Sequence, residues 1–396
     1  MDFDDTLEEA AWRAQVRAFL EQHREEGGDR DTEAARAWQA TLYDAGFVGV
    51  TWPVEMGGRG GTPMRQAIID QEMARLDLPG LINLIGIGMC GPTVIGHGSD
   101  DQKRRYLRRL LRADDIWCQL FSEPAAGSDL AALRTRAVRT GDGDWLVDGQ
   151  KVWTTRAHLA DYGILLTRTD PDVPKHRGLT MFVVDMAAPG VTVRPLRQMS
   201  GGADFNEVFF DDVVIPDAER LGDVGDGWRV ALTTLMSERL SLGGGGTEIG
   251  PRAETVARHV AAHLDALSPD RQALVRQQLG RAYVAALGAR YTGYRQLSKV
   301  SRGELPGPEA SAGKLSGTRS ARDLADLAVR VLGDDARVGG GFWHDLQAGL
   351  PGMAIAGGTD QVLRNIIGER VLGLPAEPRA DKGVPFKESV TERTMP

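Results

Sequence analysis

Two stretches in the middle of the chain combine small, hydroxyl-bearing and aromatic residues at close spacing. FSEPAAGSDL, Phe121 to Leu130, is predicted to be a strand that runs into a turn, where Gly127 and Ser128 leave backbone N–H groups and a hydroxyl free for a phosphate. DGQKVWTT, Asp148 to Thr155, sets the indole of Trp153 beside two hydroxyls. A flat aromatic ring with adjacent donors suits a tricyclic, partly apolar redox ring, although either stretch alone would also fit core and strand residues.

The elements around these stretches fall into a helical, a β and a second helical part. Apolar residues at helical spacing predict an N-terminal helical domain over residues 1–115. Alternating, β-branched and aromatic residues predict a β domain over 116–220, and Ala/Leu/Arg-rich stretches predict a C-terminal helical bundle over 221–396. This is not the alternating βαβ order of a dinucleotide-binding sheet, so the lone GxGxxG from Gly86 to Gly91 is better explained by packing than by phosphate binding.

The composition is that of a globular protein with a small acidic excess. The chain has 396 residues, of which 42% are apolar and 26% charged, and a formal net charge of −8. This charge gives no electrostatic basis for binding nucleic acid. Two cysteines, and an N-terminus without the features of a signal peptide, favour a cytoplasmic protein. The uncharged run from Leu78 to Gly96 contains prolines and glycines, so we expect a buried segment and no membrane insertion.

FSEPAAGSDL and KVWTT together resemble the flavin-contacting strands of the acyl-CoA dehydrogenase family. The resemblance covers nearly the whole chain and implies FAD as the cofactor. It also implies an α+β multidomain fold with a helical N-terminal domain, a central β-barrel and a C-terminal four-helix bundle. The further stretches similar to the family are PVEMGGRGG (Pro53 to Gly61), GPTVIGHGSDDQKRRYL (Gly91 to Leu107), NEVFFDDVVIP (Asn206 to Pro216), GDVGDGW (Gly222 to Trp228) and GGTDQVLRNIIGERVLGLP (Gly357 to Pro375).

Matched position by position, the resemblance implies flavin contacts in two parts of the chain. The hydroxyl of Ser122 would contact the flavin, Thr155 would face its N5 atom, and Ser128 would lie near the pyrophosphate or the substrate. Thr359 is also placed to be an N-cap, at a helix start whose dipole favours an anion. The implied cofactor-binding residues are Phe121, Ser122, Gly127, Ser128, Trp153, Thr154, Thr155, Thr359, Asp360 and Gln361.

The family's reaction removes the α-proton of an acyl thioester with a carboxylate while the β-hydrogen passes to flavin N5 as hydride. The usual base, the Glu of a YEGT motif, is replaced by Gly357 here. A minority of members place the base before an Arg in the first bundle helix, where this chain has Glu238 and Arg239. Glu238 shares an apolar helical stripe with Ala231 and Leu235, which would raise its pKa as a base requires, although a solvent-facing or Arg-paired carboxylate is an alternative. The resemblance implies Glu238 as the catalytic base and Ser128, Arg239, Gly357 and Gly358 as substrate-binding residues, the glycines through backbone N–H groups.

Two family motifs are missing from the chain. The ExRxxFG stretch, which supplies an Arg to the FAD pyrophosphate of a neighbouring subunit, has no counterpart in this chain. The glycine-rich QxxGGxGY motif is also missing, and the stretch most similar to it is LGDDARVGGGFWHD. Both losses resemble members that form one subunit of a heterotetramer, as in some actinobacterial sterol-degrading dehydrogenases, while a homotetramer is the alternative. The implied partners are an acyl-CoA or carrier-protein thioester as substrate and a separate electron-transfer acceptor protein.

The leading hypothesis is therefore an FAD-dependent acyl-CoA dehydrogenase. A flavin monooxygenase or oxidase of the same fold is the second, and Glu238 argues against it because oxygenation needs no α-proton base. A non-catalytic partner subunit is the third, supported by the missing pyrophosphate Arg.

Two other patterns are expected to be solvent-exposed surface. His259 and His263 lack the Glu of HExxH, so we expect them on a solvated helix face without a metal. The basic stripe from Lys103 to Arg112 is also expected on a solvated face, with binding of a CoA phosphate as the alternative.

Overall fold

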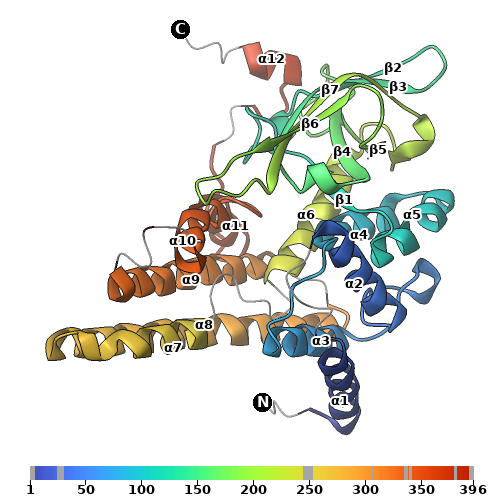
Figure 1. Cartoon of the computed structure of the whole chain (residues 1–396). Helices are drawn as coiled ribbons and strands as arrows, with labels where there is room; N and C mark the ends of the chain where they lie inside the picture. The colour runs from blue at the N-terminus through green and yellow to red at the C-terminus, as the bar shows by residue number, and fades with distance from the viewer. Residues whose placement is uncertain are drawn as a thin grey trace. The chain divides into compact units, whose positions relative to one another are not determined.

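A computed structural model describes residues 5–24, 31–243, 253–304, 307–333, 338, 341–378 and 381–391 of the chain. Figure 1 shows its helices and strands. The chain divides into two units. The first comprises Met1–Arg197, Ala203–Glu238 and Glu377–Pro396, and the second comprises Gln198–Gly202 and Arg239–Ala376.

The first helices begin at side chains that cap them. Thr6 and Glu9 form a capping box at the start of α1, and Ser99 and Gln102 form another at the start of α5. The apolar face of α5 is buried, as its spacing predicts. The elements of this part are α1 (Leu7–Gln22), α2 (Thr32–Asp44), η2 (Val54–Met56), α3 (Pro63–Arg75), η3 (Gly86–Cys90), α4 (Gly91–His97) and α5 (Asp100–Arg112).

The glycines of the GxGxxG stretch lie in close contact with other side chains. A Cβ atom on Gly91 would lie 2.0 Å from the ring of Trp52, and one on Gly86 would lie 2.3 Å from the amide of Asn83. Gly86 begins a π-helical turn that leads directly into α4. These contacts support the packing explanation for this motif.

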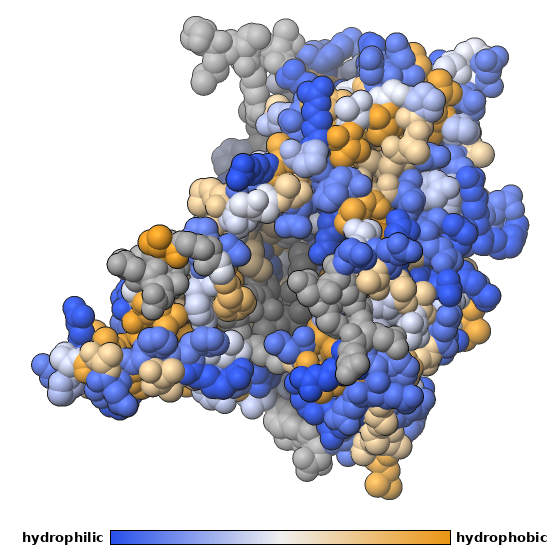
Figure 2. All heavy atoms as spheres, viewed as in Figure 1, coloured by the Kyte–Doolittle hydropathy of each residue, from blue (hydrophilic) through white to orange (hydrophobic). Residues whose placement is uncertain are grey.

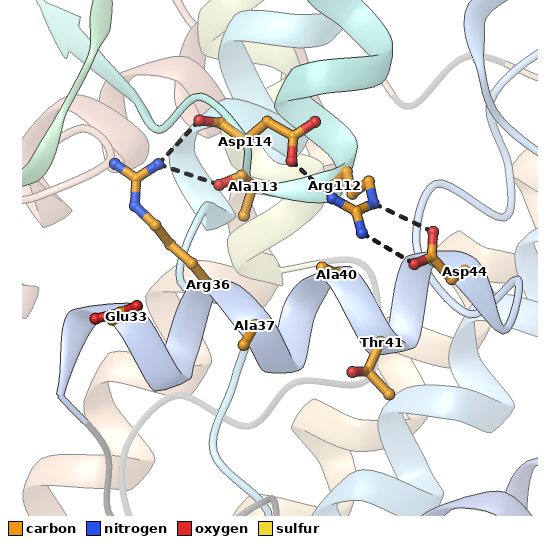
Figure 3. Close-up of a pocket in the computed structure, with 9 residues that line it drawn as sticks. All are labelled: Glu33, Arg36, Ala37, Ala40, Thr41, Asp44, Arg112, Ala113 and Asp114. Atoms are coloured by element: carbon orange, nitrogen blue, oxygen red, sulfur yellow. Dashed lines mark hydrogen bonds and ion pairs between the residues drawn. The ribbon is translucent and has the colours of Figure 1, made fainter.

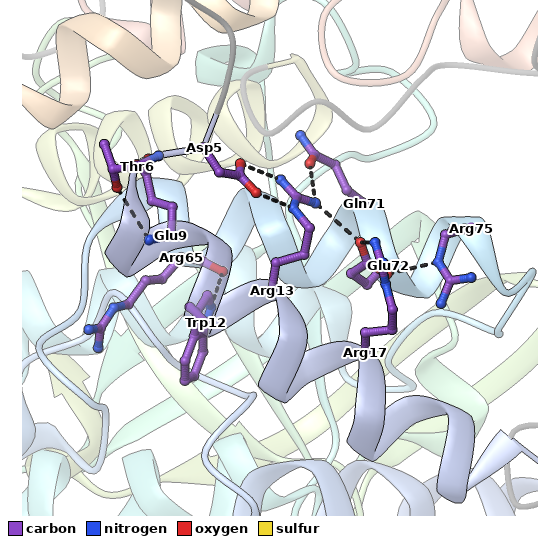
Figure 4. A network of polar contacts seen from close by, with 10 residues as sticks. All are labelled: Asp5, Thr6, Glu9, Trp12, Arg13, Arg17, Arg65, Gln71, Glu72 and Arg75. Carbon is purple, nitrogen blue, oxygen red and sulfur yellow. Dashed lines mark hydrogen bonds and ion pairs between the residues drawn. The ribbon is translucent and has the colours of Figure 1, made fainter.

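A buried carboxylate joins α1 to α3 (Figure 4). The side chain of Glu72 is 3% exposed and accepts hydrogen bonds from Arg17 at 2.9 Å, Arg75 at 2.8 Å and Arg13 at 3.2 Å. These bonds, the one from Arg17 foremost, lower the pKa of Glu72 to about 2 against the opposing effect of burial. Arg13 also forms an ion pair with Asp5, so one cluster fixes both helices.

The described strands form one eight-stranded sheet in the order β6-β7-β3-β2-β4-β5-β8, with β1 paired in parallel to β4. The sequence GDGD, Gly141 to Asp144, forms the turn between β2 and β3, where the N–H of Thr140 donates to the carbonyl of Asp144. The strands are β1 (Trp117–Leu120), β2 (Arg136–Arg139), β3 (Trp145–Thr155), β4 (Tyr162–Arg168), β5 (Leu179–Asp185), β6 (Val191–Leu196), β7 (Phe205–Ile215) and β8 (Arg220–Leu221), with helical turns η4 (Leu130–Ala132), η5 (Ala157–Leu159) and η6 (Asp217–Glu219).

Both faces of the sheet centre are buried. Ile164 and Leu166 of β4 belong to a core shared with the N-terminal helices, whereas Leu165 between them belongs to a second core. This explains why β4 and β5 read as continuous apolar runs in the sequence.

Helix α6 (Gly227–Gly243) is held against α4 by paired hydroxyl and imidazole groups. The hydroxyls of Thr93 and Thr234 lie 2.8 Å apart, and both residues are fully buried. Next to them, the Nε2 atom of His97 lies 2.8 Å from the hydroxyl of Thr233. These two contacts fix the rotation of α6 about its axis.

The second unit is helical in its described residues, as the Ala/Leu/Arg-rich stretches predict. α9 contributes the largest share of its buried residues, including Leu324, Leu327 and Ala328, which pack with α7 and α8. The elements are α7 (Ala253–His263), η7 (Leu264–Ala266), α8 (Pro269–Ser301), η8 (Pro308–Ala310), α9 (Ser311–Leu332), α10 (Phe342–Met353) and α11 (Asp360–Arg370); the chain then returns to the first unit, where α12 (Phe386–Thr391) lies.

The predicted fold class is confirmed: helical N-terminal part, central β part and helical C-terminal part follow one another. The boundaries at 115/116 and 220/221 stay predictions. Much of the visible surface is hydrophilic, with apolar side chains in scattered groups (Figure 2). None of the helices in the described ranges has the length and hydropathy to cross a membrane.

Candidate active site

The loop that follows β1 lies beside the bulged end of β3. β1 ends at Leu120, one residue before FSEPAAGSDL begins. The prediction of a strand at the start of this stretch is therefore wrong, because Phe121 already belongs to the loop. The N–H of Val152 donates to the carbonyl of Ser122 at 2.9 Å. Phe121 is buried and Ser122 half-buried. The structure therefore brings the two predicted flavin stretches together.

Trp153 lies in a bulge of β3. Pairing with β7 passes from Lys151 opposite Val208 to Thr154 opposite Asn206, so β3 carries one extra residue there. Trp153 has a φ of +60°, which is uncommon for a bulky side chain. The residue is 61% exposed, so the bulge presents the indole as a surface on which a flat ring can stack.

The hydroxyl of Thr154 is a buried polar group without a partner. Its Oγ1 atom makes no hydrogen bond among the described residues. The carbonyl of Thr154 accepts from Asn206 Nδ2 at 3.0 Å, and the other amide atom of Asn206 lies 3.1 Å from His158 Nδ1. Thr155, at the end of β3, is half-buried. A buried hydroxyl costs free energy unless it is paired, so Thr154 has a hydrogen bond to offer a bound group.

A buried ion pair lies under the loop. The Nζ atom of Lys151 is 2.9 Å from Glu123 Oε1 and also donates to the carbonyl of Phe121 at 3.0 Å. The carboxylate of Glu123 accepts further from the N–H groups of Arg134 at 2.6 Å and Thr135 at 2.9 Å. Burial lowers the pKa of Lys151, whereas Lys151 and the backbone donors hold the pKa of Glu123 below its usual value although burial opposes this.

Both residues of this pair belong to the quoted stretches, yet the sequence reasoning gave them no role. The signal available was a lysine and a glutamate in two stretches that were both expected to contact the flavin. A lysine in a strand that must be half-buried needs an acidic partner nearby.

Gly127 and Ser128 lie at the exposed turn of the loop. Glu123 and Ala126 close a tight backbone bridge just before them, with both N–H···O distances at 3.0 Å. A Cβ on Gly127 would meet nothing within 4 Å, so the backbone there is open to an approaching group. This agrees with the predicted position near a phosphate or substrate, which stays a prediction.

Glu238 lies on α6, one turn after Thr234. The side chain is half-buried. Ala231 is fully buried and Leu235 packs against the core, so the apolar stripe that directs Glu238 is present over these residues. The side chain of Arg239 lies outside the described residues, and its predicted role is not tested.

The second unit holds the remaining predicted residues. Thr359 caps α11, because its hydroxyl accepts from Val362 N–H at 3.1 Å. Gly357 and Gly358 have left-handed φ angles of 64° and 87°, and their N–H groups make no hydrogen bond among the described residues. Gln361 is exposed.

Asp360 already has a partner within the second unit. Its carboxylate lies 3.2 Å from the Nζ atom of Lys314 on α9, which also donates to the carbonyl of Gly358 at 3.0 Å. Asp360 and Lys314 are both buried. The sequence reasoning missed Lys314, which fixes the turn that carries Gly357 and Gly358.

The residues of the first unit fit a flat group with a phosphate tail. The exposed indole of Trp153, the unpaired buried hydroxyl of Thr154 and the open backbone at Gly127 lie on two adjacent segments. An aromatic surface, a hydrogen-bond donor and a glycine turn are the contacts that a flavin dinucleotide needs.

A separate depression of about 440 Å³ lies between α2 and the end of α5 (Figure 3). Arg36 donates there to the carbonyls of Ala113 and Asp114, and Arg112 forms ion pairs with Asp44 and Asp114. The cations that line it are thus held by protein groups, and none of the predicted site residues lies there.

The predicted solvent-exposed histidines and basic stripe have local partners. His259 and His263 each direct Nδ1 to the backbone carbonyl four residues earlier. On α5, the cations that form ion pairs with acidic side chains are Lys103, Arg104, Arg105, Arg109 and Arg112.

Comparison with known proteins identifies the class. The N-terminal, middle and C-terminal domains of acyl-CoA dehydrogenases match residues 6–114, 118–213 and 225–372. The chain belongs to the acyl-CoA dehydrogenase family, whose members are FAD-dependent enzymes.

Two similar proteins come from Mycobacterium tuberculosis. The acyl-CoA dehydrogenase IpdE1 is 38% identical over 360 residues, which cover 87% of this chain and 89% of that protein. The acyl-CoA dehydrogenase FadE34 is 42% identical over 340 residues, which cover 85% of this chain but only 46% of FadE34. The chain thus spans about half the length of FadE34.

A solved structure with the same fold is the Tcur3481-Tcur3483 steroid ACAD. It superposes with a TM-score of 0.81 at 29% identity, over 95% of this chain and 100% of that chain. This superposition supports the acyl-CoA dehydrogenase fold for the chain.

Proposed function

We propose that the protein binds FAD and introduces an α,β double bond into an acyl-CoA thioester. The observation that carries this proposal is the contact between the two flavin stretches, in which the loop of Phe121 and Ser122 lies against the bulge of Trp153 and Thr154. In this proposal Trp153 would support the isoalloxazine ring, and Thr155 would lie on the N5 side of that ring. Ser122 and Thr154 supply hydroxyls to the ring, and Gly127 and Ser128 face the pyrophosphate or the substrate.

Glu238 is the base in this mechanism. Its carboxylate takes the α-proton of the thioester, and its half-buried position next to the apolar residues Ala231 and Leu235 supports this role. FAD, when bound, accepts the β-hydrogen as hydride. Arg239 orients the substrate nearby.

Backbone donors complete the proposed machinery. The N–H groups of Gly357 and Gly358 are available as donors to the thioester carbonyl, where negative charge develops as the α-proton leaves. Thr359, Asp360 and Gln361 belong to the FAD-contacting helix start; Thr359 and Asp360 are occupied in capping and in the Lys314 pair, so Gln361 and backbone groups make the contacts.

The first test is the visible spectrum of the purified chain, before and after anaerobic addition of straight, branched and steroid-like acyl-CoAs. A yellow protein that bleaches supports the proposal and ranks the substrates. We expect bulky chains to bleach it fastest, since a relocated base changes the space around Cα and the superposing ACAD is named for steroids. An oxygen-dependent product with an added oxygen atom would instead establish a monooxygenase.

The base is tested by Glu238→Gln with Glu254→Gln as the matched control on another helix. Glu238→Gln should retain the flavin spectrum but reduce turnover by roughly 10²- to 10⁴-fold, because only proton transfer is removed. Glu254 forms a half-exposed contact with Arg290, so its amide should leave turnover unchanged. Full activity of Glu238→Gln would contradict the assignment.

We further propose that the protein works as a tetramer, and that a second acyl-CoA dehydrogenase chain completes the FAD site. The missing ExRxxFG motif and the paired name of the Tcur3481-Tcur3483 ACAD support a heterotetramer. Light scattering and flavin content, measured with and without a co-expressed neighbouring dehydrogenase chain, separate this from a homotetramer. Colourless protein that turns yellow only with the partner supports the heterotetramer; yellow tetramer from one chain contradicts it.

In this proposal the electrons leave the protein through a separate acceptor protein. A carrier-protein thioester is the alternative substrate to test beside acyl-CoA.

A further inference from the structure

The segment from residue 381 to 391, here called the strap, runs along the loop between β4 and β5. The N–H of Phe386 donates to the carbonyl of Val173 at 2.9 Å, and the N–H of Lys387 donates to that of Pro171 at 3.0 Å. Pro385 also forms a backbone bridge with Pro174. Figure 1 shows α12, the helix of the strap, at the β strands. The β4–β5 loop is therefore covered by a segment distant in sequence.

Lys175 joins the strap to the FSEPAAGSDL loop. Its Nζ atom lies 2.8 Å from both carboxylate oxygens of Asp129 and 2.5 Å from Asp381 Oδ2. The side chain of Lys175 is 15% exposed, whereas those of Asp129 and Asp381 are 41% and 29% exposed, so the two ion pairs are partly buried. Asp129 directly follows Ser128, the proposed phosphate or substrate contact. One ammonium group thus binds the strap and this loop together.

Arg168 makes a second connection, next to Lys175, whose carbonyl accepts a hydrogen bond from it at 2.7 Å. Its guanidinium lies 3.8 Å from the ring centroid of Phe386 in the strap. The same guanidinium donates to the carbonyls of Ala131 at 2.5 Å and Leu133 at 3.4 Å, at the far end of the loop. Arg168 is buried, so the cation is held between the aromatic ring and the loop carbonyls.

We propose that the strap positions the loop of residues 121–133 through Lys175 and Arg168. The loop carries Phe121, Ser122, Gly127 and Ser128, so the strap acts on ligand binding without touching the ligand. The binding of FAD by this loop rests on the proposed function. The ordering of the loop by the strap is independent of the proposed function. Lys175 and Arg168 are positioning residues in this inference.

The test compares two Asp→Asn changes that each remove one strap ion pair. Asp381→Asn weakens the pair with Lys175, whereas Asp172→Asn weakens the exposed pair with Lys387, which does not reach the loop. Amide hydrogen exchange of peptides covering 121–133 is measured in the full chain without flavin, and the dissociation rate of FAD is measured in the loaded protein. Asp381→Asn should accelerate both by about fivefold, a change equivalent to one partly buried ion pair. Asp172→Asn should leave both within experimental error.

Lys175→Met and Phe386→Leu keep the test decisive if Asp381→Asn folds poorly. Both should raise exchange in 121–133, Lys175→Met most strongly around Asp129. Faster exchange in 381–391 with unchanged exchange in 121–133 would overturn the proposal. If the wild-type protein binds no FAD either alone or with a co-expressed partner chain, but Asp381→Asn still loosens the loop, the proposed function fails and the strap inference stands.

Discussion

The ammonium group of Lys151 lies 2.9 Å from the carboxylate of Glu123, and both side chains are buried beneath the loop proposed to bind flavin. Lys151 also holds the carbonyl of Phe121, and Glu123 holds the N–H groups of Arg134 and Thr135. One ion pair thereby fixes the first residue of this loop and the two residues that follow the loop. A buried pair of this kind specifies geometry, since its net contribution to stability is small while the loss of one partner is costly.

Lys151→Met should destabilise the protein by about 3 kcal/mol, because Glu123 would stay buried without its cation. Thermal unfolding measures the loss, and flavin content measures the effect on the loop. Lys151→Met combined with Glu123→Gln should be more stable than Lys151→Met alone. A double variant that loses the sum of both single effects would show that the two side chains act independently.

Trp153→Phe should weaken FAD binding by roughly tenfold, because a smaller ring provides less stacking surface. The midpoint of thermal unfolding without flavin should hardly change, since Trp153 is 61% exposed. Flavin fluorescence titration gives the dissociation constant. Trp145→Phe is the contrasting change, because Trp145 is buried and donates to Asp217 at 2.8 Å; it should lower stability. If Trp153→Phe binds FAD as tightly as the wild type, the indole of Trp153 does not contribute to FAD binding.

Thr234→Val should lower stability by about 1–2 kcal/mol, since it removes a buried hydroxyl that pairs with Thr93. Turnover should fall further than stability explains, because Glu238 projects one turn later on the same helix. Thr234→Ser keeps the hydroxyl and should restore turnover. The prediction is checked by measuring kcat and the midpoint of thermal unfolding for both variants. Equal kcat values for Thr234→Val and Thr234→Ser would contradict it.

Glu72 should make stability depend on pH below about 4.5. The Arg17 hydrogen bond and its neighbours lower the pKa of Glu72 in the folded protein to about 2 from 4.5. A lowered carboxylate pKa stabilises the folded state above pH 4.5, and this contribution is lost as pH falls towards 2. Thermal midpoints of the wild type and Glu72→Gln should therefore differ most near neutral pH and converge in acid. A constant difference across this range would contradict the assignment.

The parts of the fold governed by local patterns could be predicted from the sequence. Ser99 with Gln102, Thr359 before α11 and the GDGD turn all signal their structures through residues next to one another. The order of helical and β parts followed from periodicity in the same way. Family resemblance implied that both stretches contact the flavin, and the Val152–Ser122 hydrogen bond shows that they lie next to each other.

The parts that depend on distant residues could not be predicted. The left-handed φ of Trp153 arises from an extra residue relative to β7, and nothing near Trp153 in the sequence marks that mismatch. The pairs Glu123–Lys151 and Asp360–Lys314 join segments whose meeting depends on tertiary structure. The roles of Glu238 and the other proposed site residues remain predictions.

The return of residues 381–391 to the first unit sets the order in which the protein can be completed on the ribosome. Asp129 emerges long before Asp381, and at usual translation speeds the interval is roughly 10–50 s. During that time Lys175 and Arg168 can engage the early loop but have no late partner. The newly made β part should therefore be more open to proteases and chaperones before the strap is made than afterwards, and the proposed cofactor should be retained firmly only once the strap is in place.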